Sequence, residues 1–561
     1  MRVLTKMWVG GTLSPATIAL SLLALAPIVA YALFVGYLQR DLPIYDDYII
    51  QLELAQLEAT PRLSDKLSIL FSQLNEHRLA YTRFWFWLVH WLNGTISYSA
   101  LIVIGNLPLL GIWGLFGWLL YRLRVPLVAL VPLSWLLFQF QFNSNSLWAM
   151  ASLQNITIHF LYPLLFVLLL SRNRTAWIAS GGVAILLCYT SGNGFLALVL
   201  GGGALVYQRR WRDTVGWALL SVGLGLLYFW SYQRPTNLSV ADTSTLIDKA
   251  LATLIFLGMH LEAYPQSVSF GAHVVNGLVI GGLVLLLTGW SCWQLSMRWR
   301  ARQPLTRRDG VLLVAVLMSG FIAISAVAAV QSRINLMGWV GLTESRYRLY
   351  STMLVLTGYV QLVAFASQQG WLIRRLGWVS VGLSVLVWAG ICNQKISESY
   401  LFRSQALANY HNWTQLQPDT TKALIATVFR PSGRDAAALA HIRQRVSLAA
   451  HTYPEHPRLI QSLTDEDDSY VIASANEPNS QSPNDWNMLI FWASDHFLLF
   501  PVMRKPNQDW RSFWLTQTWF DRGFQARTIK WTLKKVPYRL GFLKCRSDSL
   551  LVYRTAHIVR P

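Results

Sequence analysis

The feature that most limits the fold of this chain is a series of long apolar stretches in its first 393 residues. A helix needs about 20 apolar residues to cross the hydrocarbon core of a bilayer. Only 13% of the residues are charged, whereas a soluble chain has roughly 25%. The sequence therefore predicts an integral, multi-pass membrane protein. We expect about eleven transmembrane helices, at residues 15–38, 97–121, 125–142, 156–171, 176–190, 194–208, 214–232, 271–296, 310–331, 349–367 and 376–393.

The basic residues indicate how these helices are oriented. Arginines gather after every second stretch, beginning with Arg122 and Arg124, and an excess of Lys and Arg marks cytoplasmic loops. We expect a cytoplasmic N-terminus, an extracytoplasmic loop at 39–95 and an extracytoplasmic C-terminus, in a bacterial inner or plasma membrane. These loops hold much of the net charge of +20, so no nucleic-acid partner is expected.

Two assignments decide on which side of the membrane the later loops and the C-terminus are expected to lie. The segment 176–208 is too long for one span, and Ser-Gly-Asn-Gly at 191–194 is a turn signal. We therefore interpret it as a hairpin of two short helices. The apolar segment 250–261 is too short to span, and we expect an interfacial or re-entrant helix there.

The composition changes near residue 394, and residues 394–561 are expected to form a soluble extracytoplasmic α+β domain. Residues 418–450 have a helical pattern, and 476–486 have the composition of a loop. Runs rich in aromatic and β-branched residues predict strands. They lie at about 468–475, 487–493, 496–503, 524–534, 539–546 and 549–555.

Two polar clusters lie in the loop 39–95, which we expect to contain surface helices at 49–59 and from 67 through 75. Asp46 and Asp47 follow the first apolar stretch closely. Adjacent carboxylates raise each other's pKa toward the range of a general base; they could also bind a divalent cation or be solvated loop acids. In Glu76-His77-Arg78, the arginine could fork onto a phosphate, or the segment could be a helix cap with a snorkelling arginine.

Further candidates follow in two later loops. Arg346, Tyr347 and Arg348 lie on the expected exterior side, where arginines are unusual. They could clamp an anionic lipid phosphate, or Arg348 could anchor to headgroups. A second, uncharged set could hydrogen-bond sugar hydroxyls, although capping of a helix hairpin is the commoner role. This set is Asn145, Trp148, Asn155 and His159.

The architecture, together with Asp46-Asp47, Asn75-Glu76-His77-Arg78 and Ser345-Arg346-Tyr347, resembles the GT-C class of membrane glycosyltransferases over residues 1–393. That class includes the protein O-mannosyltransferases and the aminoarabinose transferase that modifies lipid A. The resemblance implies an enzyme that moves a sugar, with inversion, from a polyprenyl-phosphate carrier to a glycan, lipid or protein acceptor.

The resemblance also implies roles for individual residues. Asp46 or Asp47 would be the base, and His77, Arg78 and Arg346 would contact the phosphate. This chain has Asp-Asp where Asp-Glu is commoner, which leaves the choice of base open. Members that use monosaccharide carriers are generally metal-independent, so no metal is assigned. No cofactor is expected beyond the open alternative of a divalent cation at the aspartates.

Other functions fit a chain of this kind. A transporter or flippase of lipid-linked sugars would tend to have charges near the bilayer midplane, and these spans have few. A polymerase or ligase of surface glycans would be expected to have a large late exterior loop, whereas 332–348 is short. A non-enzymatic assembly factor is a further alternative.

Overall fold

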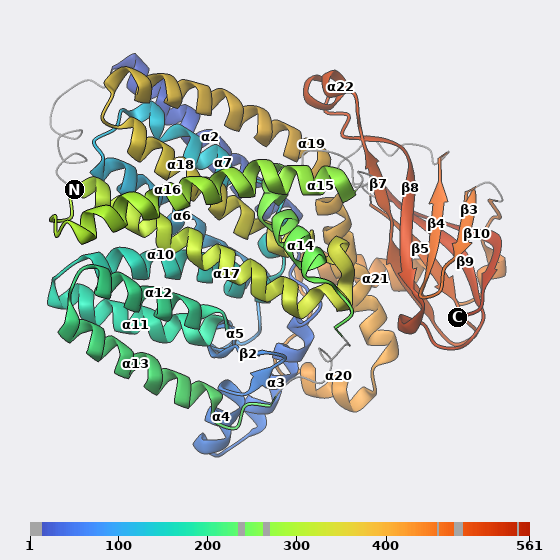
Figure 1. The fold of residues 1–561 in the computed structure, drawn as a ribbon. Coiled ribbons are helices and arrows are strands. Elements are labelled where there is room, and N and C mark those ends of the chain that lie inside the picture. The colour runs from blue at the N-terminus through green and yellow to red at the C-terminus, as the bar shows by residue number, and fades with distance from the viewer. Residues whose placement is uncertain (1–13, 234–241, 262–269, 457–458, 476–485, 547–548) are drawn as a thin grey trace.

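A helical bundle and a β-rich C-terminal region make up the computed structural model (Figure 1), which describes residues 14–233, 242–261, 270–456, 459–475, 486–546 and 549–561. Seven helical segments in these ranges are long and apolar enough to cross a membrane, judged by length and composition. They are Pro15–Leu38 (α2), Tyr98–Arg122 (α6), Ala149–Leu170 (α9, a π-helical turn and α10), Gly271–Arg300 (ending in α16), Arg307–Trp339 (in α17), Ser345–Ala366 (ending in α18) and Gly370–Leu416 (α19). These segments support a multi-pass membrane protein.

The other four expected spans are also helical, but they do not meet this criterion. Residues 125–142 form only a 3-10 turn and the short helix α7 (Val131–Leu137), in a segment interrupted by prolines. The other three are α11 (Arg174–Thr190), α12 (Gly194–Tyr207) and α13 (Trp211–Phe229). The count of about eleven spans is therefore not confirmed. The predicted break between α11 and α12 is present.

The segment 39–95 contains three helices and a small hairpin. Helix α3 is Asp47–Ala59, α4 is Leu63–Leu70 and α5 is Ala80–Asn93. The predicted helix from residue 67 through 75 is wrong, because α4 ends at Leu70. Strands β1 (Gln73–Leu74) and β2 (His77–Arg78) follow it and pair antiparallel. Asn75 at the tip has φ +50°, a left-handed conformation that Asn tolerates better than most residues.

The segment expected to be interfacial or re-entrant forms α14 (Leu246–Gly258) and a 3-10 turn, Met259–Leu261. It packs against α17 and against α15 (Phe270–Asn276) with its π-helical continuation, Gly277–Gly282. Gly258 and Gly277 mark the crossing: a Cβ on Gly258 would lie 2.4 Å from the Cα of Gly277. Only glycine permits this approach, so the buried C-terminal half of α14 packs closely against this π-helical segment.

Helix α19 joins the bundle to the C-terminal region. It runs unbroken through the predicted domain boundary at 393/394 for 47 residues, about 70 Å at 1.5 Å per residue. Helices α20 (Asp419–Ile425) and α21 (Gly433–Arg445) follow within the predicted helical region. The buried ion pair Arg40–Asp435 (2.5 Å) ties α21 back to the end of α2. The first loop is thereby fixed to the C-terminal region.

Two four-stranded antiparallel sheets complete the C-terminal region, in the orders β10-β9-β5-β6 and β3-β4-β8-β7. The strands are β3 (Ser462–Asp465), β4 (Ser469–Ser474), β5 (Trp486–Trp492), β6 (Phe497–Pro501), β7 (Met503–Pro506), β8 (Phe520–Ile529), β9 (Tyr538–Arg546) and β10 (Ser549–Val559). All six predicted strands are present, while β3 and β7 were not anticipated. The predicted loop 476–486 lies, apart from residue 486, outside the described residues.

A shared apolar core joins the sheets, with Ile472 of β4, Phe491 of β5 and Phe542 of β9 buried together. The opposite face of β5 and β6 packs against α19, where Asn412 bonds to the backbone of Leu499 in both directions. The first sheet is therefore covered on both faces. This explains why β5 reads as a continuous apolar run instead of an alternating one.

Candidate functional site

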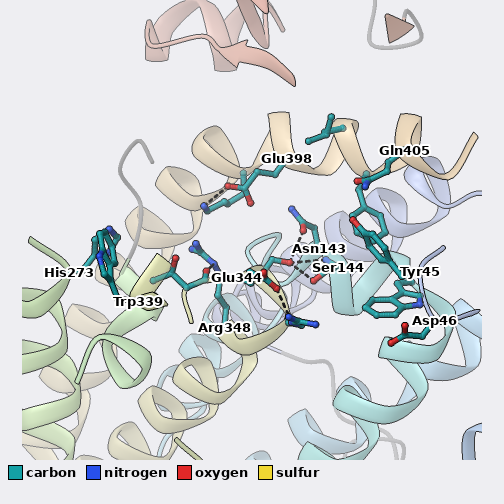
Figure 2. A pocket seen from close by; sticks show the side chains of 17 residues that line it. Tyr45, Asp46, Asn143, Ser144, His273, Trp339, Glu344, Arg348, Glu398 and Gln405 are labelled. Carbon is teal, nitrogen blue, oxygen red and sulfur yellow. Dashed lines mark hydrogen bonds and ion pairs between the residues drawn. The ribbon is translucent and has the colours of Figure 1, made fainter. Parts of the chain in front are cut away.

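Two cavities meet where the first loop, the segment of α8 (Asn143–Leu147) and α9 (Ala149–Ala151), and the α17–α18 junction come together. One has a volume of about 730 Å³ and the other about 480 Å³. Asp46, Trp148 and Arg346 line both of them. We call the larger one the charged cavity and the smaller one the hairpin cavity, because the β1–β2 tip lines it. In Figure 2, Asp46 lies at one end of the charged cavity, while His273 and Trp339 lie at the other.

Asp46 is a lining residue of both cavities. It is the N-cap residue of α3, and its backbone carbonyl accepts hydrogen bonds from Ile49 and Ile50. Its half-buried side chain forms no hydrogen bond or ion pair within the described part of the chain. Burial raises the pKa of Asp46, and the charge of Arg346 opposes that shift. A carboxylate of raised pKa beside a cavity is suited to accept a proton.

Asp47 is buried and points elsewhere. Its side chain is 1% exposed and lines neither cavity. The Oδ2 atom accepts the amide hydrogen of Ile44 at 3.1 Å, and Oδ1 accepts that of Met150 at 2.9 Å. Burial raises the pKa of Asp47 to about 8, although these two hydrogen bonds act in the opposite direction. The residue therefore connects the turn before α3 to the start of α9.

This arrangement bears on the alternative of a divalent cation at the two aspartates. Asp47 is buried and lines neither cavity, so the two carboxylates do not face one cavity together. Within the described ranges, no group of three or more His, Cys, Asp or Glu side chains is placed to hold a metal.

The tip of the β1–β2 hairpin faces the hairpin cavity. Glu76 forms an ion pair with Arg333 of α17 and lies 3.7 Å from Nε2 of His77. Burial opposes ionisation of Glu76, but its ion pair with Arg333 prevails and lowers its pKa. The amide of Gly192 donates to Nδ1 of His77 at 3.1 Å. That bond requires a neutral imidazole with its proton on Nε2, in agreement with the lowered pKa of buried His77.

Arg78 lines neither cavity. Its guanidinium donates to the backbone carbonyls of Phe71, Tyr228 and Trp230 at 2.6–2.7 Å. Two of these carbonyls belong to the C-terminal end of α13, where backbone acceptors lack helical partners. These contacts connect the first loop to α13 through Arg78, whose side chain faces neither cavity.

Arg346 lies between the two cavities. Its Nε atom is 2.8 Å from a carboxylate oxygen of Glu344, and its guanidinium lies 5.1 Å from the ring centre of Tyr347. The amide of Asn145 donates to the Arg346 carbonyl at 2.8 Å, and Ser144 bonds Ser345. The polar segment 143–145 thus holds Ser345 and Arg346 in place. Figure 2 shows this contact at Ser144.

The other predicted residues divide into lining and supporting positions. Arg348 lines the charged cavity, while Tyr347 and Asn155 line the hairpin cavity. Trp148 lines both and packs edge-on against Tyr45 at 5.1 Å. His159 is fully buried, lines neither cavity and bonds the carbonyl of Asn155 at 2.6 Å. The structure therefore brings Asp46, Glu76, His77, Arg346, Tyr347, Arg348, Trp148 and Asn155 together around the two cavities.

Sequence reasoning missed several lining residues. Arg333 follows the apolar stretch 310–331 and could have been found as a second exterior arginine. Lys395 and Glu398 line the charged cavity from α19, beyond the point where the membrane region was expected to end. Asn193 was interpreted as a hairpin tip, but it also lines the hairpin cavity and donates to the Tyr350 hydroxyl at 2.7 Å.

Comparisons of this chain with protein-family models, with curated proteins and with solved structures found no match.

Proposed function

We propose that this protein is an inverting glycosyltransferase that moves a sugar from a polyprenyl-phosphate carrier to an acceptor hydroxyl. The observation that supports this most directly is the shared wall of the two cavities. An unpaired carboxylate, Asp46, and a cation, Arg346, lie in contact with both. A transfer reaction needs this arrangement, because two substrates must meet at one base and one charge-stabilising group.

The linings of the cavities differ in a way that fits two substrates. Bundle residues give the hairpin cavity apolar walls, among them Phe195, Leu196 and Ala329, beside Arg333 and Arg346. This combination suits a phosphate with an isoprenoid tail. Charged side chains form a larger part of the lining of the charged cavity, where Arg348, Lys395 and Glu398 lie beside aromatic residues such as Trp339 and Phe402. This cavity suits a polar acceptor.

In the proposed reaction, Asp46 accepts the proton of the acceptor hydroxyl as the oxygen attacks the anomeric carbon. The bond from that carbon to the phosphate oxygen breaks, and polyprenyl phosphate leaves with the bonding electrons. Arg346 and Arg333 offset the charge that develops on the leaving phosphate. Attack opposite the leaving group inverts the anomeric configuration. The base contributes about 10²–10⁴-fold and each charge-stabilising group several kcal/mol.

The test uses the purified full-length protein with polyprenyl-phosphate-linked hexoses and pentoses, with an envelope extract as the source of acceptors. Released polyprenyl phosphate and new glycosidic bonds are both measured. Asp46→Asn is expected to reduce transfer by about 10²–10⁴-fold. Asp65→Asn is the matched control, since Asp65 is an exposed acid on α4 of the same loop; its activity should be unchanged.

Full activity of Asp46→Asn would refute the assignment of the base. Movement of the labelled lipid across vesicle membranes without any new glycosidic bond would instead establish a transporter. Incorporation of whole glycan chains, without use of single sugars, would establish a polymerase or ligase.

A further inference from the structure

Five arginines surround a separate cavity of about 490 Å³ at the other end of the helical bundle. They come from the ends of α6, α10, α12 and α16 and from the start of α17. Its lining contains no aspartate or glutamate. We call it the arginine cavity; its arginines are Arg122, Arg172, Arg209, Arg302 and Arg307.

We propose that the arginine cavity binds a phosphate-bearing anion, independently of the glycosyl-transfer site. None of the five arginines forms an ion pair with a carboxylate in the part of the chain that the structure describes. The nearby acids are already engaged, because Asp213 pairs with Arg210 and Asp309 with Arg298. Five like charges around one small volume create a positive potential that attracts anions.

Helix dipoles offer a simpler explanation for basic residues here, but they account for only part of the charge. Each helix C-terminus has a partial charge of about −0.5. Four helices end at this cavity and α17 begins there with the opposite partial charge, so the dipoles together offset about one and a half of the five arginine charges. The remaining positive charge would attract a multivalent anion such as a phosphate ester.

Several of these side chains are held in place. The guanidinium of Arg209 lies 5.1 Å from the ring of Trp299 and donates to its carbonyl at 2.9 Å. Arg122 lies 5.0 Å from the ring of Trp118. Arg209 and Arg302 both have φ values near +55° just after helix ends, at positions where glycine is usual. Arginine at such positions places a guanidinium at the rim of the cavity at some conformational cost.

The position of the cavity relates it to the bilayer. Arg307 lines it at the start of α17, and Arg333 of the same helix lines the hairpin cavity. The 26 residues between them correspond to about 39 Å at 1.5 Å per residue. A bilayer with its headgroups is about 40–45 Å thick. For a helix close to the bilayer normal, this length would place the arginine cavity near the headgroups of the membrane face opposite Asp46.

The shared chemistry is a phosphate group, which a lipid headgroup or a soluble polyphosphate could supply. Binding is measured by native mass spectrometry on the full-length protein, separately with cardiolipin, with phosphatidylcholine and with inorganic diphosphate. The test variant is Arg122→Gln/Arg307→Gln. The control is Arg374→Gln/Arg375→Gln, which removes the same charge from the start of α19, outside the cavity. Arg122→Lys/Arg307→Lys restores the charge.

We expect the wild type to prefer cardiolipin or diphosphate over phosphatidylcholine, and the preferred probe identifies the source. Each basic residue near a phosphate contributes roughly a fivefold factor, so the Gln pair should bind about 30-fold more weakly. The control and the Lys pair should bind within about threefold of the wild type on that scale. Equal binding of all three probes, or equal weakening by the test and control pairs, would overturn the proposal.

Discussion

Replacing Asp47 by Asn tests the most specific electrostatic feature of the first loop. The buried carboxyl of Asp47 accepts two backbone amides but contacts neither cavity. Asparagine has nearly the same shape, retains one carbonyl acceptor and cannot ionise. Its NH2 group cannot accept the second backbone amide, so the variant should lose about 1–3 kcal/mol at every pH, and only the pH-dependent part of the difference reports on ionisation of Asp47. Transfer activity near pH 6 should be retained, in contrast to Asp46→Asn.

The sign of the pH effect follows from the raised pKa. The pKa of Asp47 is about 8 in the folded protein, against 3.8 for an unperturbed aspartate, because burial disfavours the charged form. The resulting stabilisation is complete below about pH 4 and is lost as the pH rises toward 8. One pKa unit corresponds to about 1.4 kcal/mol. Between pH 5 and 8 the wild type should lose roughly 4 kcal/mol relative to Asp47→Asn.

The assay is thermal unfolding of both proteins in the same detergent from pH 5 to 8. Groups other than Asp47 titrate equally in both, so the difference in apparent melting temperature isolates this residue. The Asn variant should melt below the wild type at pH 5, and by pH 8 the difference in stability should have shifted by roughly 4 kcal/mol in favour of the Asn variant. A constant difference across the range, or a wild type that gains stability with pH, would refute the burial argument.

Three further predictions concern other contacts. Arg78→Ala removes three hydrogen bonds to backbone carbonyls and should lower the unfolding free energy, measured by denaturant unfolding, by about 2–4 kcal/mol. Unchanged stability together with weakened donor binding would instead make Arg78 a phosphate contact. Asp435→Asn leaves the buried Arg40 charge unpaired and should cost about 3–5 kcal/mol. Replacing both by Met and Leu should recover most of that loss, and failure to do so would show that the pair is required as such. Arg333→Gln should raise the KM for the donor about 10–100-fold, while the exposed control Arg62→Gln should change it little. An equal KM in both variants would show that Arg333 does not contact the donor phosphate.

Much of the fold could be predicted from local patterns in the sequence. Apolar length predicted the long helices, and the aromatic and β-branched runs predicted six strands within a few residues of their observed positions. The errors fall where local pattern and packing disagree. The helix expected through residue 75 stops at Leu70, because residues 73–78 pair as a hairpin that Arg78 attaches to α13. That attachment comes from a residue about 150 positions away.

The candidate site was predicted in part. Short motifs identified Asp46 and Arg346, which the structure brings to a common wall. The motif around Arg78 did not distinguish it from Arg333, which was not named, although only Arg333 faces a cavity. An arginine has the same local sequence pattern whether its guanidinium binds a backbone carbonyl or faces solvent. The sequence therefore does not distinguish the two roles.

The sequence by itself determined a helical membrane scaffold, a β-rich C-terminal region and a polar first loop with two adjacent aspartates, because apolar length and residue propensity act within a few turns of chain. Only the tertiary structure decided that one aspartate faces two cavities while its neighbour is buried against Ile44 and Met150. Burial and hydrogen-bond partners depend on segments about 100 residues apart, and these contacts set the environment and pKa of each carboxyl group.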